Sequence, residues 1–274
     1  DGYEPITIFV ATVFFAFQIY CDFSGYSDIA IGASRIMGIE LMQNFKAPYR
    51  ATSISDFWSR WHMSLSTWFK DYLYIPLGGN RVTFVRLCFN LFLVFMISGF
   101  WHGANWTFII WGALHGLYTV TEIIIRKYGS KNDINNPKVD FVVIGLRRII
   151  VFYLVCFAWI FFRAESVSKA MYIAKEYLLA IPSYVYHLTQ KGYLWLEPLI
   201  FKKDIRLNLM DFLLLGCALG ILFFINKIEY KTKFVNYLDS KPLFFKWSFY
   251  QSLLLIIFIF ASFHSKQEFI YFQF

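Results

Sequence analysis

Long apolar windows separated by short polar segments dominate the pattern of this chain. Each window approaches the length of about 20 residues that a helix needs to cross the hydrocarbon of a bilayer. The windows are 5–20, 87–100, 106–125, 141–162, 207–226 and 247–263. The first two are short and suit helices that are tilted, re-entrant or extended by their polar flanks. The pattern therefore predicts an all-α polytopic membrane protein, a helical bundle with short re-entrant or interfacial helices.

The polar motifs are concentrated in the first part of the chain. We expect a motif-rich core over 18–116 and plainer spanning helices over 117–274, all within one transmembrane domain, 1–274. The chain starts without Met, and its first apolar window begins almost at once. We therefore expect it to be the C-terminal part of a longer protein.

The segment 53–81 has a different pattern, because its large apolar residues recur at helical spacing along one face. They are Ile54, Phe57, Trp58, Trp61, Leu65 and Trp68. Ser53 and Asp56 resemble a capping box at its start, and Asp56 and Arg60 are spaced to pair. This predicts an amphipathic helix at the membrane interface. His62 lies within it, and a structural or a catalytic role is equally open there.

The composition supports a membrane location and explains the charge. Hydrophobic residues make up 58% of the chain and charged residues 16%, below the quarter typical of soluble domains. The net charge of +8 comes with basic residues that gather between the windows, over 126–148 and 227–246, as expected of cytoplasmic loops. The less basic loop 163–206 is expected outside. The basic charge thus predicts contact with a lipid bilayer and no nucleic-acid partner.

His102 is the strongest candidate for chemistry, since its titratable imidazole interrupts the apolar run GFWHGANWTFIIWGALHG, 99–116. Ionisable groups at membrane depth are usually functional. Gly99 and Gly103 carry no side chain, so a substrate or a neighbouring helix can approach closely. A neutral imidazole with a pKa near 6.5 is able to act as a general base.

Two other histidines compete for a place beside His102. On a single helix, His115 would lie roughly 20 Å further along the axis and on another face, so the two should not share a site. We expect His115 to bond a neighbouring helix instead. His62 belongs to another element and is free to approach His102 across the fold.

Further polar residues are candidates for substrate, oxyanion or channel contacts, and the charged ones are Asp22, Asp28 and Arg60. Asp22 and Asp28 follow the first window and should face water, a cavity or a basic partner. Pairing with Arg35, Arg50 or Arg60 is favoured over substrate contact. The remaining candidates, as hydrogen-bond donors to a developing oxyanion, are the Asn105 amide, the indoles of Trp101 and Trp106, and backbone near Gly103. The four cysteines lack metal-ligand spacing, so no metal site is expected.

The residues alone leave three classes of function open. A membrane enzyme and a transporter or flippase with a His and Asp proton relay are equally favoured. A structural membrane subunit, whose histidines only bond neighbouring helices, is the third.

Three ordered strings carry a family resemblance: YCDFSGYSDIAIG, DFWSRWHMSLSTWFKDYLYIPLGGNR and GFWHGANWTFIIWGALHG. Together they resemble the membrane-bound O-acyltransferase family, in particular its bacterial alginate O-acetyltransferase-like branch. The resemblance is strong over 18–116, and the segments 159–166 and 269–274 resemble that branch too. Ser59 is a departure, since the branch usually has Arg there.

The resemblance implies an acyltransferase with His102 as the catalytic histidine and His62 as the second family histidine. It implies transfer of acetyl from cytoplasmic acetyl-CoA, with no bound cofactor, to a hydroxyl of an extracytoplasmic polysaccharide, directly or through a separate acetylating protein. It also implies a multi-pass protein of the cytoplasmic membrane. The nearest alternative is D-alanyl transfer to teichoic acid from a carrier-protein thioester.

Overall fold

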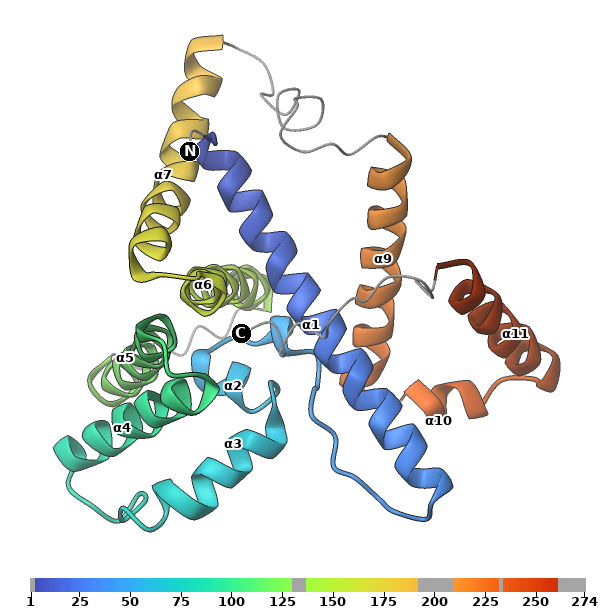
Figure 1. Cartoon of the computed structure of the whole chain (residues 1–274), viewed down its shortest axis with the longest axis horizontal. Helices are drawn as coiled ribbons and strands as arrows, with labels where there is room; N and C mark the ends of the chain where they lie inside the picture. The colour runs from blue at the N-terminus through green and yellow to red at the C-terminus, as the bar shows by residue number, and fades with distance from the viewer. Residues whose placement is uncertain (1–2, 130–136, 192–208, 232–233, 261–274) are drawn as a thin grey trace. The chain divides into compact units, whose positions relative to one another are not determined.

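All regular elements in the described parts of the chain are helices. The computed structural model describes residues 3–129, 137–191, 209–231 and 234–260 (Figure 1). Within these ranges, four helices are long and apolar enough to cross a membrane: α1 (Pro5–Ile36), α4 (Phe84–His102), α5 (Trp106–Tyr128) and the Phe141–Arg163 part of α6 (Pro137–Arg163). The prediction of an all-α polytopic membrane protein is confirmed.

The described helices fall into two compact units. One is Asp1–Leu207, which holds α1 to α7, and the other is Asn208–Gln273. The second contains α9 (Leu209–Lys231), α10 (Phe234–Asp239) and α11 (Leu243–Phe260). Its shorter apolar stretches, Leu213–Ile228 and Leu243–Ile259, match the last two windows of the hydropathy pattern. The single domain 1–274 stays a prediction. The candidate site lies in the first unit.

The run 99–116 contains a break between two helices, at 103–105, so its treatment as one helix was wrong. α4 ends at His102, and α5 begins at Trp106 with Asn105 as its N-cap. The two helices pack as an antiparallel hairpin, since Gly99 lies against Gly112 and Phe92, further back in α4, against Gly116, further on in α5. A side chain at Gly99 would collide with the α5 backbone. The glycines therefore admit a neighbouring helix, as small residues do in membrane bundles.

The amphipathic segment is likewise interrupted, which corrects the prediction of one continuous helix. α2 (Ile54–Trp58) starts at the Ser53 N-cap, whose hydroxyl accepts from the Asp56 N–H at 3.0 Å. α3 (Met63–Phe69) continues into a π-helix, η2 (Lys70–Tyr74). Between α2 and α3 the chain turns at His62, which has left-handed backbone angles (φ 44°, ψ 55°). This conformation costs on the order of 1–2 kcal/mol for a residue other than glycine.

α1, α6 and α7 (Val167–Lys191) pack against one another, and α6 also packs against α5 of the hairpin. α7 occupies most of the segment expected to be a loop, 163–206, so that prediction was wrong for 167–191. α1 packs against α6 and α7: Phe9 contacts the rings of Tyr153 and Tyr177, and the Tyr177 hydroxyl donates to the Tyr153 carbonyl at 3.1 Å. Aromatic contacts therefore join the three helices, beside buried alanines of α7 at helical spacing, Ala170, Ala174 and Ala180.

Candidate active site

His102 ends α4 inside a cluster of aromatic rings. Its imidazole centroid lies 5.0 Å from Trp111 of α5 and 5.3 Å from Phe162 of α6, both in edge-to-face contact. The Trp101 ring lies at 5.0 Å as well. Trp111 and Phe162 are almost completely buried. Rings from three helices, α4, α5 and α6, thus contact the imidazole.

His62 reaches the same region from the turn between α2 and α3. Its ring packs edge-on against Phe23 of α1 at 4.8 Å, and it lies within electrostatic range of His102. Burial lowers the pKa of His62 from its ordinary value of 6.5 to about 4. His62 is therefore neutral at physiological pH and able to accept a hydrogen bond. The structure brings the two family histidines together, and their catalytic roles stay predictions.

His115 is much closer to this site than a single helix would allow. Because α5 folds back along α4, Trp111 contacts both His102, at 5.0 Å, and His115, at 5.1 Å. The predicted wide separation of His115 from His102 was wrong. The expected bond of His115 to a neighbouring helix is confirmed, since the Trp58 indole N–H donates to its Nδ1 at 3.2 Å. An indole is only a donor, so Nδ1 carries no proton.

Asn105, Trp101 and Trp106 differ in how well they are placed to serve as donors. Asn105 is engaged structurally, because Oδ1 accepts from the Thr107 N–H at 3.1 Å and Nδ2 donates to the Glu165 carbonyl at 3.2 Å. Trp101 is 57% exposed but touches His102, whereas Trp106 is 70% exposed. Their roles stay predictions. The geometry favours Trp101 over the other two.

The charged candidates are arranged differently from the expected pairing. Arg60 binds Asp56 through Nε and Oδ1 at 2.6 Å, as its spacing indicated, and also donates to the Lys46 carbonyl. Asp22 and Asp28 are exposed on α1, and within the described residues neither forms an ion pair. The expectation that they pair with arginine was therefore wrong, since both carboxylates lie at the surface of the unit.

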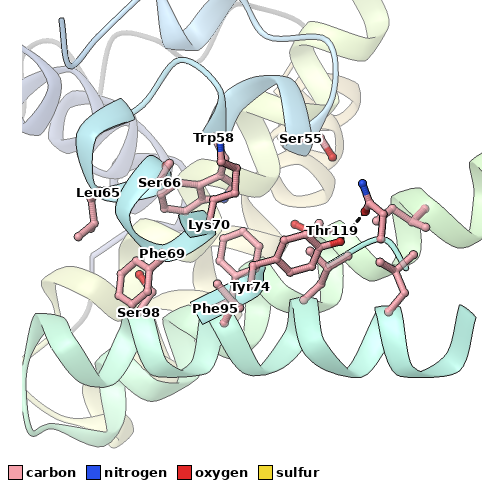
Figure 2. Close-up of a pocket in the computed structure, with 15 residues that line it drawn as sticks. Ser55, Trp58, Leu65, Ser66, Phe69, Lys70, Tyr74, Phe95, Ser98 and Thr119 are labelled. Carbon is pink, nitrogen blue, oxygen red and sulfur yellow. Dashed lines mark hydrogen bonds between the residues drawn. The ribbon is translucent and has the colours of Figure 1, made fainter. Parts of the chain in front are cut away.

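A largely apolar cavity of about 360 Å³ lies between the α2 to η2 segment and the α4–α5 hairpin (Figure 2). Neither histidine lines it, but Ser66 and Ser98 do, and each is four residues from a family histidine. Each serine therefore lies one helical turn, about 5.4 Å along the chain's helical axis, from its histidine. Tyr74 and Asn80 also line the cavity, and the Tyr74 hydroxyl donates to Asn80 Oδ1 at 2.6 Å.

Two residues near the histidines were not singled out in the sequence. Trp111 touches His102, and its buried indole N–H has no partner among the described residues. The sequence signal that could have identified Trp111 is its position one helical turn before His115. Asn44, in the segment between α1 and α2, bonds the residues after His62. Nothing in the sequence pairs Asn44 with that turn. Nor do His, Cys, Asp and Glu side chains of the described ranges gather into a metal site.

Comparisons with known proteins agree with these motifs. The profile of the MBOAT, membrane-bound O-acyltransferase family, matches residues 4–140. The chain is similar to "Peptidoglycan O-acetyltransferase" of Helicobacter pylori, 45% identical over 62% of this chain and 31% of that protein. It is similar to "Probable alginate O-acetylase AlgI" of Azotobacter vinelandii, 48% identical over 57% of this chain and 30% of that protein.

A teichoic acid D-alanyltransferase of Bacillus subtilis is also similar, 34% identical over 55% of this chain and 40% of that protein. The chain spans about three tenths of the length of the two O-acetylating relatives. The match to the family profile nevertheless covers half of the chain and includes both histidine motifs. The chain therefore belongs to the membrane-bound O-acyltransferase family.

Proposed function

We propose that this protein transfers an acetyl group from a thioester donor, acetyl-CoA, to a hydroxyl of an extracytoplasmic polysaccharide. The observation that carries the proposal is the meeting of His62 and His102, from two separate family motifs, in a buried aromatic cluster. The similarity to a peptidoglycan O-acetyltransferase and to a probable alginate O-acetylase supports acetyl as the acyl group.

In the proposed reaction, neutral His102 acts as the general base. It takes the proton of the acceptor hydroxyl as that oxygen attacks the thioester carbonyl carbon. The new C–O bond forms, the C–S bond breaks, and the departing thiolate takes the proton from the imidazolium. An ester and a free thiol result, and His102 is neutral again. His62 orients the acceptor or relays the proton, which its neutral state permits.

The developing oxyanion needs a hydrogen-bond donor in a site that excludes water. Trp111 is suited to this role, because its indole touches the His102 ring and its N–H is buried with no described partner. A buried unpaired donor is costly, by about 1–3 kcal/mol, unless a ligand or water engages it. Trp111 thus joins Trp101 as a proposed donor.

The cavity of Figure 2 is the proposed path of the thioester arm. Lys70 is among its lining residues, and Lys127, at the end of α5, packs over the Phe84 ring at the start of α4. By the positive-inside rule this basic end of the hairpin faces the cytoplasm. The turn 103–105 then faces the opposite side, where the acceptor polysaccharide or a separate acetylating protein would meet the site. The membrane in question is the cytoplasmic membrane.

The test is the loss of ester-linked acetyl from cell-surface polymers when His102→Ala replaces the native protein at equal membrane level. Acetate released by mild alkali is measured by mass spectrometry, with Gln43→Ala, an exposed residue, as the control. Unchanged acetate in His102→Ala would refute the proposal.

Two alternatives predict other results in the same cells. D-alanyl transfer, supported by the similarity to the teichoic acid enzyme, predicts loss of ester-linked D-alanine with acetate unchanged. A transporter or flippase predicts altered substrate movement with no missing acyl product.

A further inference from the structure

The turn that carries His62 is held by a second segment of the chain, 44–47. Among the described residues, only Ala47 and His62 combine a side chain with a positive φ, 48° and 44°. They lie in two segments that bond each other: the Lys46 N–H donates to the Arg60 carbonyl at 3.0 Å, and the Met63 N–H to the Asn44 carbonyl at 3.0 Å. Left-handed residues of this kind persist where their surroundings enforce them, commonly at functional sites.

Asn44 makes the bonds that lie nearest to His62. Its carbonyl accepts from Met63, and its Oδ1 accepts from the Ser64 N–H at 3.2 Å and the Ser64 hydroxyl at 2.6 Å. On its other side, Nδ2 donates to the Ser27 hydroxyl of α1 at 3.4 Å. One half-buried residue therefore connects α1 to the two positions that follow His62.

These bonds replace the usual capping of a helix. His62 is the N-cap of α3 but makes no capping bond with its side chain. The first N–H groups of a helix need acceptors from outside the helix, which an N-cap side chain normally supplies. Asn44 supplies them for Met63 and Ser64. The imidazole of His62 is thereby left available for the site.

We infer that Asn44 is a positioning residue, which fixes the left-handed turn at His62 and so keeps that imidazole beside His102. The inference rests on the proposed acyl transfer for its kinetic consequences. Asn44 acts through the backbone of 62–64 and does not touch the reacting atoms. If Asn44 only connected α1 to α3, its substitution would change the amount of folded protein without changing the chemistry of His62.

The test compares Asn44→Ala with Asn44→Asp, which keeps the Oδ1 acceptor, and with the control Gln43→Ala. Acetyl transfer from acetyl-CoA is measured in native membranes that contain the protein as it is expressed in the cell. The rate is divided by the amount of the protein. We expect Asn44→Ala to lower kcat at least tenfold with KM for acetyl-CoA within twofold. Asn44→Asp should stay within threefold of the unmodified protein, and Gln43→Ala should be unchanged.

Two further measurements separate positioning from general folding. In a His62→Asn background, Asn44→Ala should lower kcat no further, because its effect passes through His62. The rate at which diethyl pyrocarbonate modifies His62, followed by mass spectrometry, should rise at least fivefold in Asn44→Ala. Should Asn44→Ala not accumulate, Ser64→Ala removes the 2.6 Å bond alone and should lower kcat about threefold.

The inference is overturned by normal kcat in Asn44→Ala or Ser64→Ala, by equal loss in Asn44→Asp, by additive losses with His62→Asn, or by unchanged modification of His62. Failure of the proposed function looks different. In that case the unmodified protein shows no more acetyl transfer than His102→Ala, while the modification rate of His62 still tests the role of Asn44.

Discussion

Protonation of His62 should destabilise the folded protein in mild acid. Burial lowers the pKa of His62 to about 4, whereas the unfolded chain titrates near 6.5. Between these values the unfolded state binds more protons than the folded state, so stability falls as the pH decreases from 6.5 to 4. This pKa difference corresponds to about 3 kcal/mol of unfolding free energy in all. About 2 kcal/mol of it is lost between pH 7.5 and 5.

The comparison variant is His62→Asn, which has no titration in this range. Asn is among the residues that best tolerate left-handed backbone angles, so it keeps the turn while removing the imidazole. The free energy of unfolding is measured at pH 7.5 and pH 5 in mixed micelles of a mild detergent and SDS. We expect the unmodified protein to lose about 2 kcal/mol more than His62→Asn over this interval.

Equal pH dependence of the two proteins would refute this reasoning. It would mean that the imidazole reaches water in the folded state and titrates near 6.5. A steeper loss in His62→Asn would also refute it, because the sign requires the buried neutral histidine to be the group penalised by acid.

Three further predictions concern packing and capping, each measured as an unfolding free energy at pH 7.5. Gly112→Ala should cost about 1–3 kcal/mol, because the new Cβ would lie 3.2 Å from the Gly99 backbone and collide with the Phe95 carbonyl. Gly32→Ala, in open space, should cost nothing, and an equal cost would contradict the close hairpin. Trp58→Phe leaves Nδ1 of His115 without its donor and should cost about 1–3 kcal/mol, whereas Trp106→Phe should be neutral. Ser53→Ala should cost about 0.5–2 kcal/mol and Ser53→Asp much less, and equal losses would exclude side-chain capping of α2.

The helical membrane class and the principal histidines could be predicted from sequence because their signals are local. A window of apolar residues is sufficient to indicate a spanning helix. Three of the long candidates, α4, α5 and the apolar part of α6, follow their windows closely, whereas α1 continues past its window to Ile36. The Ser53 cap and the Asp56–Arg60 pair depend on residues only three or four apart, and both form. α7 was missed because its mixed polarity gives no apolar window.

The predicted position of His115 was wrong because a break in a helix decides which residues meet. Gly103 to Asn105 turn the chain back on itself, and this brings His115 to the same tryptophan that touches His102. A helical period assumed across the break places the two histidines far apart. Hydropathy does not report such a reversal, because both helices are equally apolar.

By itself, the sequence determined the lipid environment, the helix pattern and the two family motifs, since each depends on composition or on short spacing. Only the tertiary structure decided that His62 and His102 share a cluster, that Trp111 connects His102 to His115, and that Asn44 secures the turn at His62. These contacts join residues far apart in the chain. They form when helices pack and buried donors find acceptors, and no local pattern encodes that pairing.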